Sequence, residues 1–275
     1  MSERTFQVGV IGAGNMAEAI FRGALEAGVL GADAVLAADP SAERRSVFEG
    51  MGIEAVDDAA EVVRRSRRVL LSVKPQTLPV VGPALAKAGA GTDGQTLISI
   101  MAGVRSNAIA AAVARPDAAV VRVMPNTPLM VGRGMSAVCA NAACPSDEAT
   151  FVRQLFAASG EVVAVEESQM DAVTAVSGSG PAYLFYLSEA IERAGVALGL
   201  DAEVSAMLAR QTLAGAAALL VAEGAPGPAE LRARVTSPGG TTAAAIATFD
   251  EAGVGAGVEA GLRACAARSI ELGGG

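Results

Sequence analysis

The chain has 275 residues, of which 52% are hydrophobic and 18% charged, so it has enough apolar material for a buried core and enough length for two domains. A formal net charge of −8 and a pI near 4.8 argue against nucleic-acid binding, because such a surface repels phosphate backbones. No apolar run reaches the roughly 18 residues of a membrane span, and the first strand begins near Phe6, which leaves no room for a signal peptide; we therefore expect a cytoplasmic protein.

Histidine and cysteine, the side chains that usually bind zinc, are scarce. The chain has no histidine, and its three cysteines, Cys139, Cys144 and Cys265, follow no Cys-x-x-Cys spacing. This pattern predicts inert thiols and neither a disulfide framework nor a metal site. A basic cluster predicts a solvated helix end, where positive charge offsets the helix dipole: Arg64, Arg65, Arg67 and Arg68.

The stretch from Val8 to Ala17 predicts a strand, a tight turn and a helix. Gly12 suits the turn, Gly14 lets a ligand approach the backbone, and the small Ala17 lets the helix pack on its strand. The N–H groups at the start of that helix would face a pyrophosphate. A glycine-rich turn alone is weak evidence, but a strand precedes this one and Asp39 ends the next strand, as in dinucleotide-binding domains.

Short apolar runs alternate with helical patterns over residues 1–166. The predicted strands are Gln7–Ile11, Val35–Asp39, Val69–Val73, Thr96–Ile100, Ala119–Met124 and Glu161–Val165. The predicted helices are Asn15–Ala27, Ala42–Gly50, Asp58–Arg65 and Ser106–Ala114. This alternation predicts an α/β fold with a Rossmann-like, doubly wound parallel sheet, in which ligands bind at the carboxyl ends of the strands.

Three loops at those carboxyl ends are candidates for the site: Ser72–Gln76, Met101–Gly103 and Met124–Pro128. Proline and glycine punctuate any loop, so ordinary turn chemistry is the alternative explanation. Against it, Lys74 is one of only two lysines in the chain and falls where a dinucleotide would pass.

From residue 167 to 275 the strand pattern disappears and an all-α domain is predicted. Pro181 suits the first turn of a helix, and Asp201 suits the cap of the next one, Ala202–Ala222. Within that helix Thr212–Val221 is apolar nearly all round, which requires neighbours on every side. We infer a dimerisation domain that completes its core against another subunit; a helix wedged between the two domains is the alternative.

The stretch Thr236–Thr242 places two glycines, flanked by hydroxyl residues, before the predicted helix Ala243–Glu251. Successive N–H groups at such a helix start form a nest for an anion such as a carboxylate. Simple helix capping by a serine or threonine side chain explains the stretch equally well.

Five motifs together closely resemble those of pyrroline-5-carboxylate reductases. They are IGAGNMA at Ile11–Ala17, SVKPQ at Ser72–Gln76, VRVMPNTP at Val121–Pro128, DAVTAVSGSGPAY at Asp171–Tyr183 and VTSPGGTT at Val235–Thr242. The resemblance covers essentially the whole chain, and the last two motifs are the specific ones. It implies reduction of 1-pyrroline-5-carboxylate to L-proline with NADP(H) or NAD(H), in the final step of proline biosynthesis. It also implies a homodimer joined through the helical domains, which often assembles into a decamer.

The resemblance also implies the site residues. The cofactor would be bound by Ile11, Gly12, Ala13, Gly14, Asn15, Met16, Ser72, Val73, Lys74, Pro75, Met101, Ala102 and Gly103. The substrate would be bound by Glu167, Ser237, Gly239, Gly240, Thr241 and Thr242, with the Thr242 hydroxyl on the ring nitrogen as the catalytic group. The chain departs from the family at Asp57-Asp58-Ala59, where many members carry an asparagine that helps to hold the adenosine part of the cofactor.

The residues past the second predicted strand bear on cofactor preference. Ser41, Arg44 and Arg45 lie where a 2′-phosphate would sit and favour NADPH, with NADH usable. Asp39 has the opposite effect, because an acidic residue there accepts hydrogen bonds from a free ribose hydroxyl and repels phosphate. The neighbouring Pro40 would turn that carboxylate aside.

The implied chemistry suits a chain without histidine, because a protonated cyclic imine is already an electrophile and becomes a neutral amine without a strong acid. Other functions remain open. A beta-hydroxyacid dehydrogenase shares the domain plan but needs a catalytic lysine in the helical half, and none follows Lys87. A deazaflavin-dependent NADP reductase shares the first domain, and a non-catalytic NAD(P)-sensing protein would bind the nucleotide without turnover.

Overall fold

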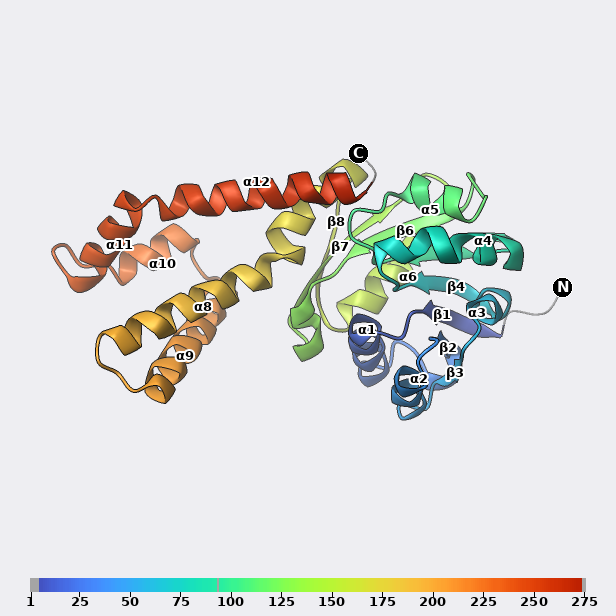
Figure 1. The fold of residues 1–275 in the computed structure, drawn as a ribbon, viewed down its shortest axis with the longest axis horizontal. Helices are drawn as coiled ribbons and strands as arrows, with labels where there is room; N and C mark the ends of the chain where they lie inside the picture. Colours follow the sequence, from blue (N-terminus) through green and yellow to red (C-terminus); the bar gives the residue numbers. More distant parts are fainter. Residues whose placement is uncertain (1–4, 93, 274–275) are drawn as a thin grey trace. The chain divides into compact units, whose positions relative to one another are not determined.

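The computed structural model describes residues 5–92 and 94–273 (Figure 1). The chain forms two compact units: the first comprises residues up to Gly180 together with the segment from Cys265 onward, and the second is Pro181–Ala264. The division at residue 180 lies beyond the predicted boundary at 166/167, and the end of the chain returns to the first unit. Each unit is described by itself below.

The strands of the first unit form one sheet of eight strands in the order β3-β2-β1-β4-β5-β6-β7-β8. Their bounds are β1 Phe6–Ile11, β2 Val35–Ala38, β3 Glu54–Val56, β4 Ser66–Leu71, β5 Thr96–Ser99, β6 Ala119–Met124, β7 Gly134–Ala140 and β8 Gly160–Ala164. The strands from β3 to β6 are parallel, which confirms the doubly wound prediction. The expectation of a wholly parallel sheet is wrong at β7, which runs antiparallel to β6 because residues 125–133 are too few for a crossover.

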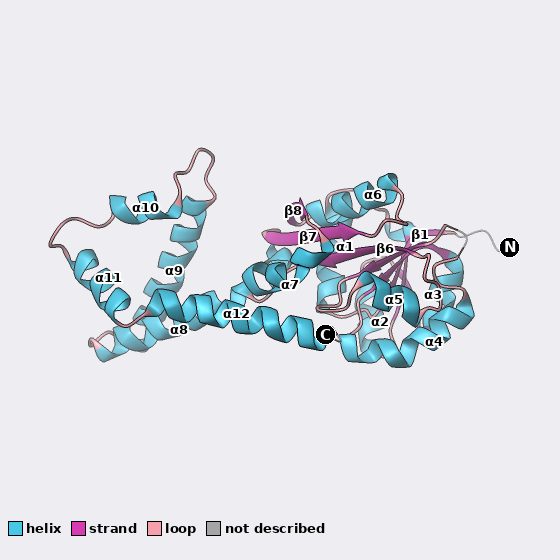
Figure 2. Cartoon of the chain, turned by 90° about the horizontal axis from the view of Figure 1, so that it is seen from above, coloured by secondary structure: helices cyan, strands magenta, loops and turns pink. Residues whose placement is uncertain are grey.

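Helices cover both faces of this sheet (Figure 2). Helices α1 (Asn15–Glu26), α2 (Ala42–Glu49) and α6 (Ser146–Ala157) pack on one face, and α3 (Ala59–Arg65), α4 (Leu78–Ala88) and α5 (Ser106–Ala112) pack on the other. Along β4, Leu70 joins the first apolar core, whereas Val69 and Leu71 join the second. Successive side chains of a strand point to opposite faces, so a strand covered on both sides is apolar throughout.

Several elements were not among those predicted: β3, β7, α4, α6 and the long helix α12 (Val254–Leu272). Two prolines obscured α4, but Pro79 lies in the first turn, where a missing N–H costs nothing, and Pro83 is tolerated further in. The helix is held by its buried Leu78 and Leu85. Packing therefore overrides the local signal of the prolines.

The predicted solvated cluster of arginines is wrong for Arg68. Arg64 and Arg65 do end α3, but β4 begins at Ser66 and turns the Arg68 side chain into the protein. There Arg68 donates to both carboxylate oxygens of Glu148 on α6, at 2.6 and 2.9 Å, and lies 3.7 Å from the centre of the Phe151 ring. The side chains of Arg68 and Glu148 are only 9% and 4% exposed, so this pair links β4 to α6 inside the unit.

The second unit contains helices only, within the described residues. They are α8 (Gly180–Ala197), α9 (Ala202–Leu220), α10 (Pro228–Arg234), α11 (Thr241–Glu251) and the first part of α12. Asp201 stands at the cap position of α9, as expected, but its side chain makes no capping hydrogen bond. The predicted all-round apolar stretch leaves Leu219, Leu220 and Val221 exposed by 61%, 50% and 72% in the single chain. No helix in the described part of the chain is long and apolar enough to cross a membrane.

Candidate functional site

The glycine turn after β1 lies at the point where the strand order reverses. Gly12 adopts φ +95°, and a Cβ there would lie 2.8 Å from the carbonyl oxygen of Ser72, so only glycine fits. The Gly12 N–H donates to Ala38 O at 2.8 Å, and the Ser72 N–H donates to Ile11 O at 2.9 Å. The predicted tight turn is confirmed, and it brings the loops after β1, β2 and β4 to one edge of the sheet.

Helix α1 begins with its backbone donors open. Its N-cap is Gly14, no side chain makes a capping hydrogen bond, and a Cβ on Gly14 would meet no atom within 4 Å. The first N–H groups of a helix have no partner inside the helix and attract an anion. This part of the chain, including the exposed Asn15, therefore fits the pyrophosphate of a dinucleotide.

Asp39 and Arg44 flank this turn with opposite charges. The Asp39 carboxylate accepts from Ala13 N–H and from Ser41 N–H, both at 2.9 Å, so it is tied to the backbone on both sides. The Arg44 Nε donates to the carbonyl oxygen of Ala13 at 2.6 Å. Both predicted cofactor residues thus hold the backbone of Ala13, Asp39 through its N–H and Arg44 through its carbonyl oxygen.

The loops after β4 and β5 differ in how far their side chains are exposed to solvent. Lys74 is exposed after β4, whereas Met101 after β5 is buried in the core, so its backbone and not its side chain borders the sheet edge. Gly103 has φ +76° and packs against the last turns of α12, where a Cβ would lie 2.8 Å from Ser269 O. At the position where the family's asparagine is absent, Asp58 caps α3 by accepting from Ala60 N–H at 2.8 Å.

Glu167, predicted to line the substrate, is held by partners within its own unit. It follows β8 and accepts from Ser106 N–H and from Arg122 Nη1, both at 2.8 Å, and also from the Ser106 hydroxyl. Burial opposes its ionisation, but the hydrogen bonds from Ser106 and Arg122 outweigh burial and lower the pKa of this carboxyl below its usual value. Glu167 therefore fixes the start of α5 to β6.

The predicted substrate loop lies in the second unit, at the start of α11. Gly239 has φ +70°, and the Gly240 N–H donates to Ser237 O at 3.0 Å. Gly240 is the N-cap, and no side chain makes a capping hydrogen bond there. The structure thus favours an open anion-binding helix start over capping by serine or threonine, with Thr241 and Thr242 in the first turn.

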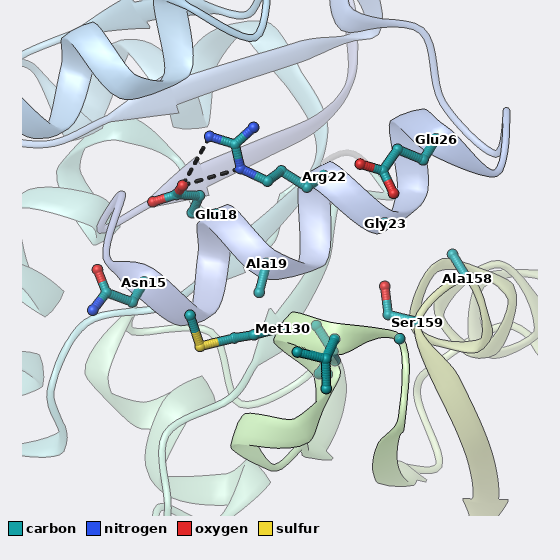
Figure 3. Close-up of a pocket in the computed structure, with 12 residues that line it drawn as sticks. Asn15, Glu18, Ala19, Arg22, Gly23, Glu26, Met130, Ala158 and Ser159 are labelled. Carbon is teal, nitrogen blue, oxygen red and sulfur yellow. Dashed lines mark hydrogen bonds and ion pairs between the residues drawn. The ribbon is translucent and has the colours of Figure 1, made fainter.

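A cleft of about 480 Å³ lies beside α1, and Figure 3 shows Glu18, Arg22 and Glu26 along the helix with Met130 opposite. Its remaining walls come from residues 129–132 and 158–159. Of the predicted cofactor residues, only Asn15 lines it. The other predicted cofactor residues thus lie outside the lining of this cleft.

The cysteines are free thiols. Burial, with the charge of Glu148, raises the pKa of Cys144 to about 11, and burial followed by the charge of Glu167 raises the pKa of Cys139. Both thiols therefore stay protonated near neutral pH and are poor nucleophiles, as expected.

The sequence did not point to three residues that the structure places around these sites: Glu18, Ser106 and Arg122. Arg122 is a charged residue inside an apolar run, which is a recognisable signal for a buried ion pair. Glu18 and Ser106 look like ordinary surface and capping residues, and only their partners distinguish them.

Two family models match the chain in separate regions. The model described as "Pyrroline-5-carboxylate reductase dimerisation" matches residues 167–272, and "NADP oxidoreductase coenzyme F420-dependent" matches residues 7–103. The second covers only the dinucleotide-binding part, which agrees with the shared first domain of the deazaflavin-dependent alternative.

Relatives match over the full length. A pyrroline-5-carboxylate reductase of Pseudomonas aeruginosa is 43% identical over 98% of this chain and 97% of its own, and one of Synechocystis sp. is 39% identical over 98% and 99%. Among solved structures, a pyrroline-5-carboxylate reductase of Coxiella burnetii has a TM-score of 0.88 at 32% identity, covering 98% of each chain. The Plasmodium falciparum pyrroline carboxylate reductase, solved with NADP bound, has a TM-score of 0.86 at 26% identity, covering 99% of this chain and 100% of that one.

Proposed function

We propose that this chain, which belongs to the pyrroline-5-carboxylate reductase family, reduces 1-pyrroline-5-carboxylate to L-proline with NADP(H), and also with NAD(H). The observation that carries the proposal is a pair of open helix starts: α1 and α11 both have a glycine N-cap and no side-chain cap. One suits the pyrophosphate of a dinucleotide, and the other suits the carboxylate of the substrate.

The proposed cofactor site is the sheet edge around the glycine turn. The N–H groups of residues 14–17 bind the pyrophosphate, Asp39 and Arg44 meet the adenosine ribose, and the loops at Ser72–Pro75 and Met101–Gly103 border the rest. When bound, the reduced nicotinamide supplies the hydride. We further propose that NADPH is preferred, because Arg44 and Arg45 lie beside Asp39. An NADH preference that Arg44→Ala leaves unchanged would refute this preference.

The proposed substrate site is the start of α11. Backbone N–H groups of residues 239–242 are proposed to hold the carboxylate, although that of Gly240 also donates to Ser237 O at 3.0 Å and so closes the turn. The Thr242 hydroxyl hydrogen-bonds the ring nitrogen. Because the imine is protonated before it is reduced, the protein needs to orient it and exclude water and does not need a strong acid. Glu167, the other predicted substrate residue, belongs to the first unit and there holds the start of α5.

The test is to add 1-pyrroline-5-carboxylate to the purified protein with NADPH, and then with NADH, and to follow the loss of nucleotide absorbance and the formation of proline. Turnover with this imine supports the proposal. Nucleotide binding without turnover would favour the NAD(P)-sensing alternative, and reduction of a deazaflavin in place of the imine would favour the deazaflavin-dependent reductase.

We also propose a cytoplasmic homodimer formed through the second unit, with a decamer as the larger assembly, and no membrane or nucleic-acid partner. The exposed apolar side chains of α9, including Leu219, support the dimer, as does the dimerisation model that matches residues 167–272. Leu219→Glu is expected to give insoluble or unfolded protein. Light scattering that finds a stable wild-type monomer at micromolar concentration would refute the dimer.

A further inference from the structure

Arg44 is held at the glycine turn by two different acceptors. Its Nε donates to Ala13 O at 2.6 Å, and its Nη2 donates to Glu18 Oε2 on α1 at 2.8 Å. The side chains of Arg44 and Glu18 are 24% and 23% exposed, so the pair is half-buried and only partly screened by water. Arg44 is therefore already paired before any anion arrives.

Glu18 divides its carboxylate between two arginines. Oε2 accepts from Arg44, and Oε1 accepts from Nε and Nη2 of Arg22, one turn further along α1, at 3.0 and 2.9 Å (Figure 3). The hydrogen bond from Arg44 is the largest influence on the pKa of Glu18; with the contribution of Arg22 it outweighs burial and lowers this pKa, so the group is ionised near neutral pH.

The charges around the glycine turn consequently almost cancel. Asp39 and Glu18 are negative, and Arg44, Arg45 and Arg22 are positive, which leaves a single net positive charge. A phosphate monoester carries roughly two negative charges at neutral pH, so a 2′-phosphate meets repulsion from both carboxylates. The uncharged ribose hydroxyl of NADH meets no such repulsion.

We propose that Glu18 is a specificity-determining residue that competes with the 2′-phosphate of NADPH for Arg44 and thereby keeps NADH usable. This inference rests on the proposed function, because it concerns the cofactor of the same site. Since Asp39 is engaged with Ala13 and Ser41 on both oxygens, Glu18 is the carboxylate whose removal releases a phosphate-binding donor. If Glu18 instead positioned Arg44 for the phosphate, removing Glu18 would weaken NADPH binding. The direction of the change in NADPH affinity therefore distinguishes competition from positioning.

The test is direct binding of NADPH and NADH, by nucleotide fluorescence and calorimetry without substrate, to wild type, Glu18→Gln and Glu26→Gln. Glutamine preserves the shape and helix propensity of Glu18 while removing its charge. Glu26 lies two turns further along α1, is exposed and lines the same cleft, so Glu26→Gln removes the same charge away from Arg44. Circular dichroism verifies that each variant is folded.

We expect Glu18→Gln to bind NADPH roughly 5- to 10-fold more tightly, with the gain shrinking at high salt, and NADH within about twofold of wild type. Glu26→Gln should bind both as wild type does. In an Arg44→Ala background, Glu18→Gln should no longer strengthen NADPH binding, because the two residues act through one contact.

Unchanged or weaker NADPH binding by Glu18→Gln, or an equal gain in Glu26→Gln, would overturn this inference and leave the proposed function intact. Wild-type protein that bound neither nucleotide would overturn both. If Glu18→Gln were unfolded, Arg22→Gln provides the second measurement. In this variant Glu18 has Arg44 as its only arginine partner among these two, so NADPH binding should weaken relative to NADH binding. Tighter NADPH binding by Arg22→Gln would overturn the inference.

Discussion

Replacing Gly103 with alanine is expected to destabilise the first unit and disturb the loop proposed to border the cofactor. The residue adopts φ +76°, and a Cβ would lie 2.8 Å from Ser269 O and 3.2 Å from Gly273 N, on the last turns of α12. Left-handed backbone costs an L-residue about 1–2 kcal/mol, and overpacking costs about 1–3 kcal/mol more, so we expect the free energy of unfolding to fall by about 2–5 kcal/mol.

The matched control separates the two contributions. Gly28 has φ +68°, and a Cβ there meets nothing within 4 Å, so Gly28→Ala carries the backbone strain alone and should cost about 1–2 kcal/mol. The measurement is urea unfolding of wild type and both variants at one protein concentration, because the stability of an oligomer depends on concentration.

A second measurement connects this packing to function. Because the loop at Met101–Gly103 borders the proposed cofactor site, Gly103→Ala should also weaken NADPH binding, whereas Gly28→Ala should not. If Gly103→Ala were as stable as Gly28→Ala and bound NADPH as wild type does, the contact between this loop and α12 would not restrict the chain, and the reasoning would fail.

Glu148→Gln leaves the buried Arg68 guanidinium without its ion pair, and the ring of Phe151 offsets only part of the loss. We therefore expect denaturant unfolding to show that the free energy of unfolding falls by about 2–4 kcal/mol. A change below about 0.5 kcal/mol would contradict the burial argument. Thr242→Ala should lower kcat/KM for the imine by roughly 10- to 150-fold, with cofactor affinity unchanged and activity largely restored in Thr242→Ser; wild-type kinetics would remove the hydroxyl from the site. The lowered pKa of Glu167 means that this carboxyl binds a proton less readily in the folded protein than in the unfolded chain. Its contribution to the free energy of unfolding is therefore present above about pH 4.3 and is lost as the pH falls through the folded pKa. The stability of Glu167→Gln should converge on that of wild type in acid, and stability curves that stay parallel as the pH falls would refute the assignment.

The sequence determined the parts of this protein that depend on short stretches of chain. The apolar strands are recognisable because both faces of the sheet are covered, and the glycines at positions 12 and 239 are recognisable because their backbone angles exclude other residues. The start of α1 is likewise predictable from the sequence, because Gly12, Gly14 and Ala17 are close together in the chain. The motif at Val235–Thr242 predicts the start of α11 but does not distinguish an anion-binding helix start from capping by a serine or threonine side chain. The structure places Gly240 at the N-cap with no side-chain hydrogen bond, which argues against side-chain capping.

The tertiary structure decided which charged residues face one another, because that depends on segments far apart in the chain. Arg68 seemed to continue an exposed basic cluster until its partner, 80 residues further along, proved to be the buried Glu148. The antiparallel β7 likewise depends on the short connection from β6, and α4 forms despite Pro83 because its apolar face has a core to pack on. The sequence identifies Arg44 as a candidate phosphate ligand, but it does not show that Glu18 pairs with Arg44. Hydrogen bonds between charged side chains depend on their spacing in the fold and leave no periodicity in the sequence.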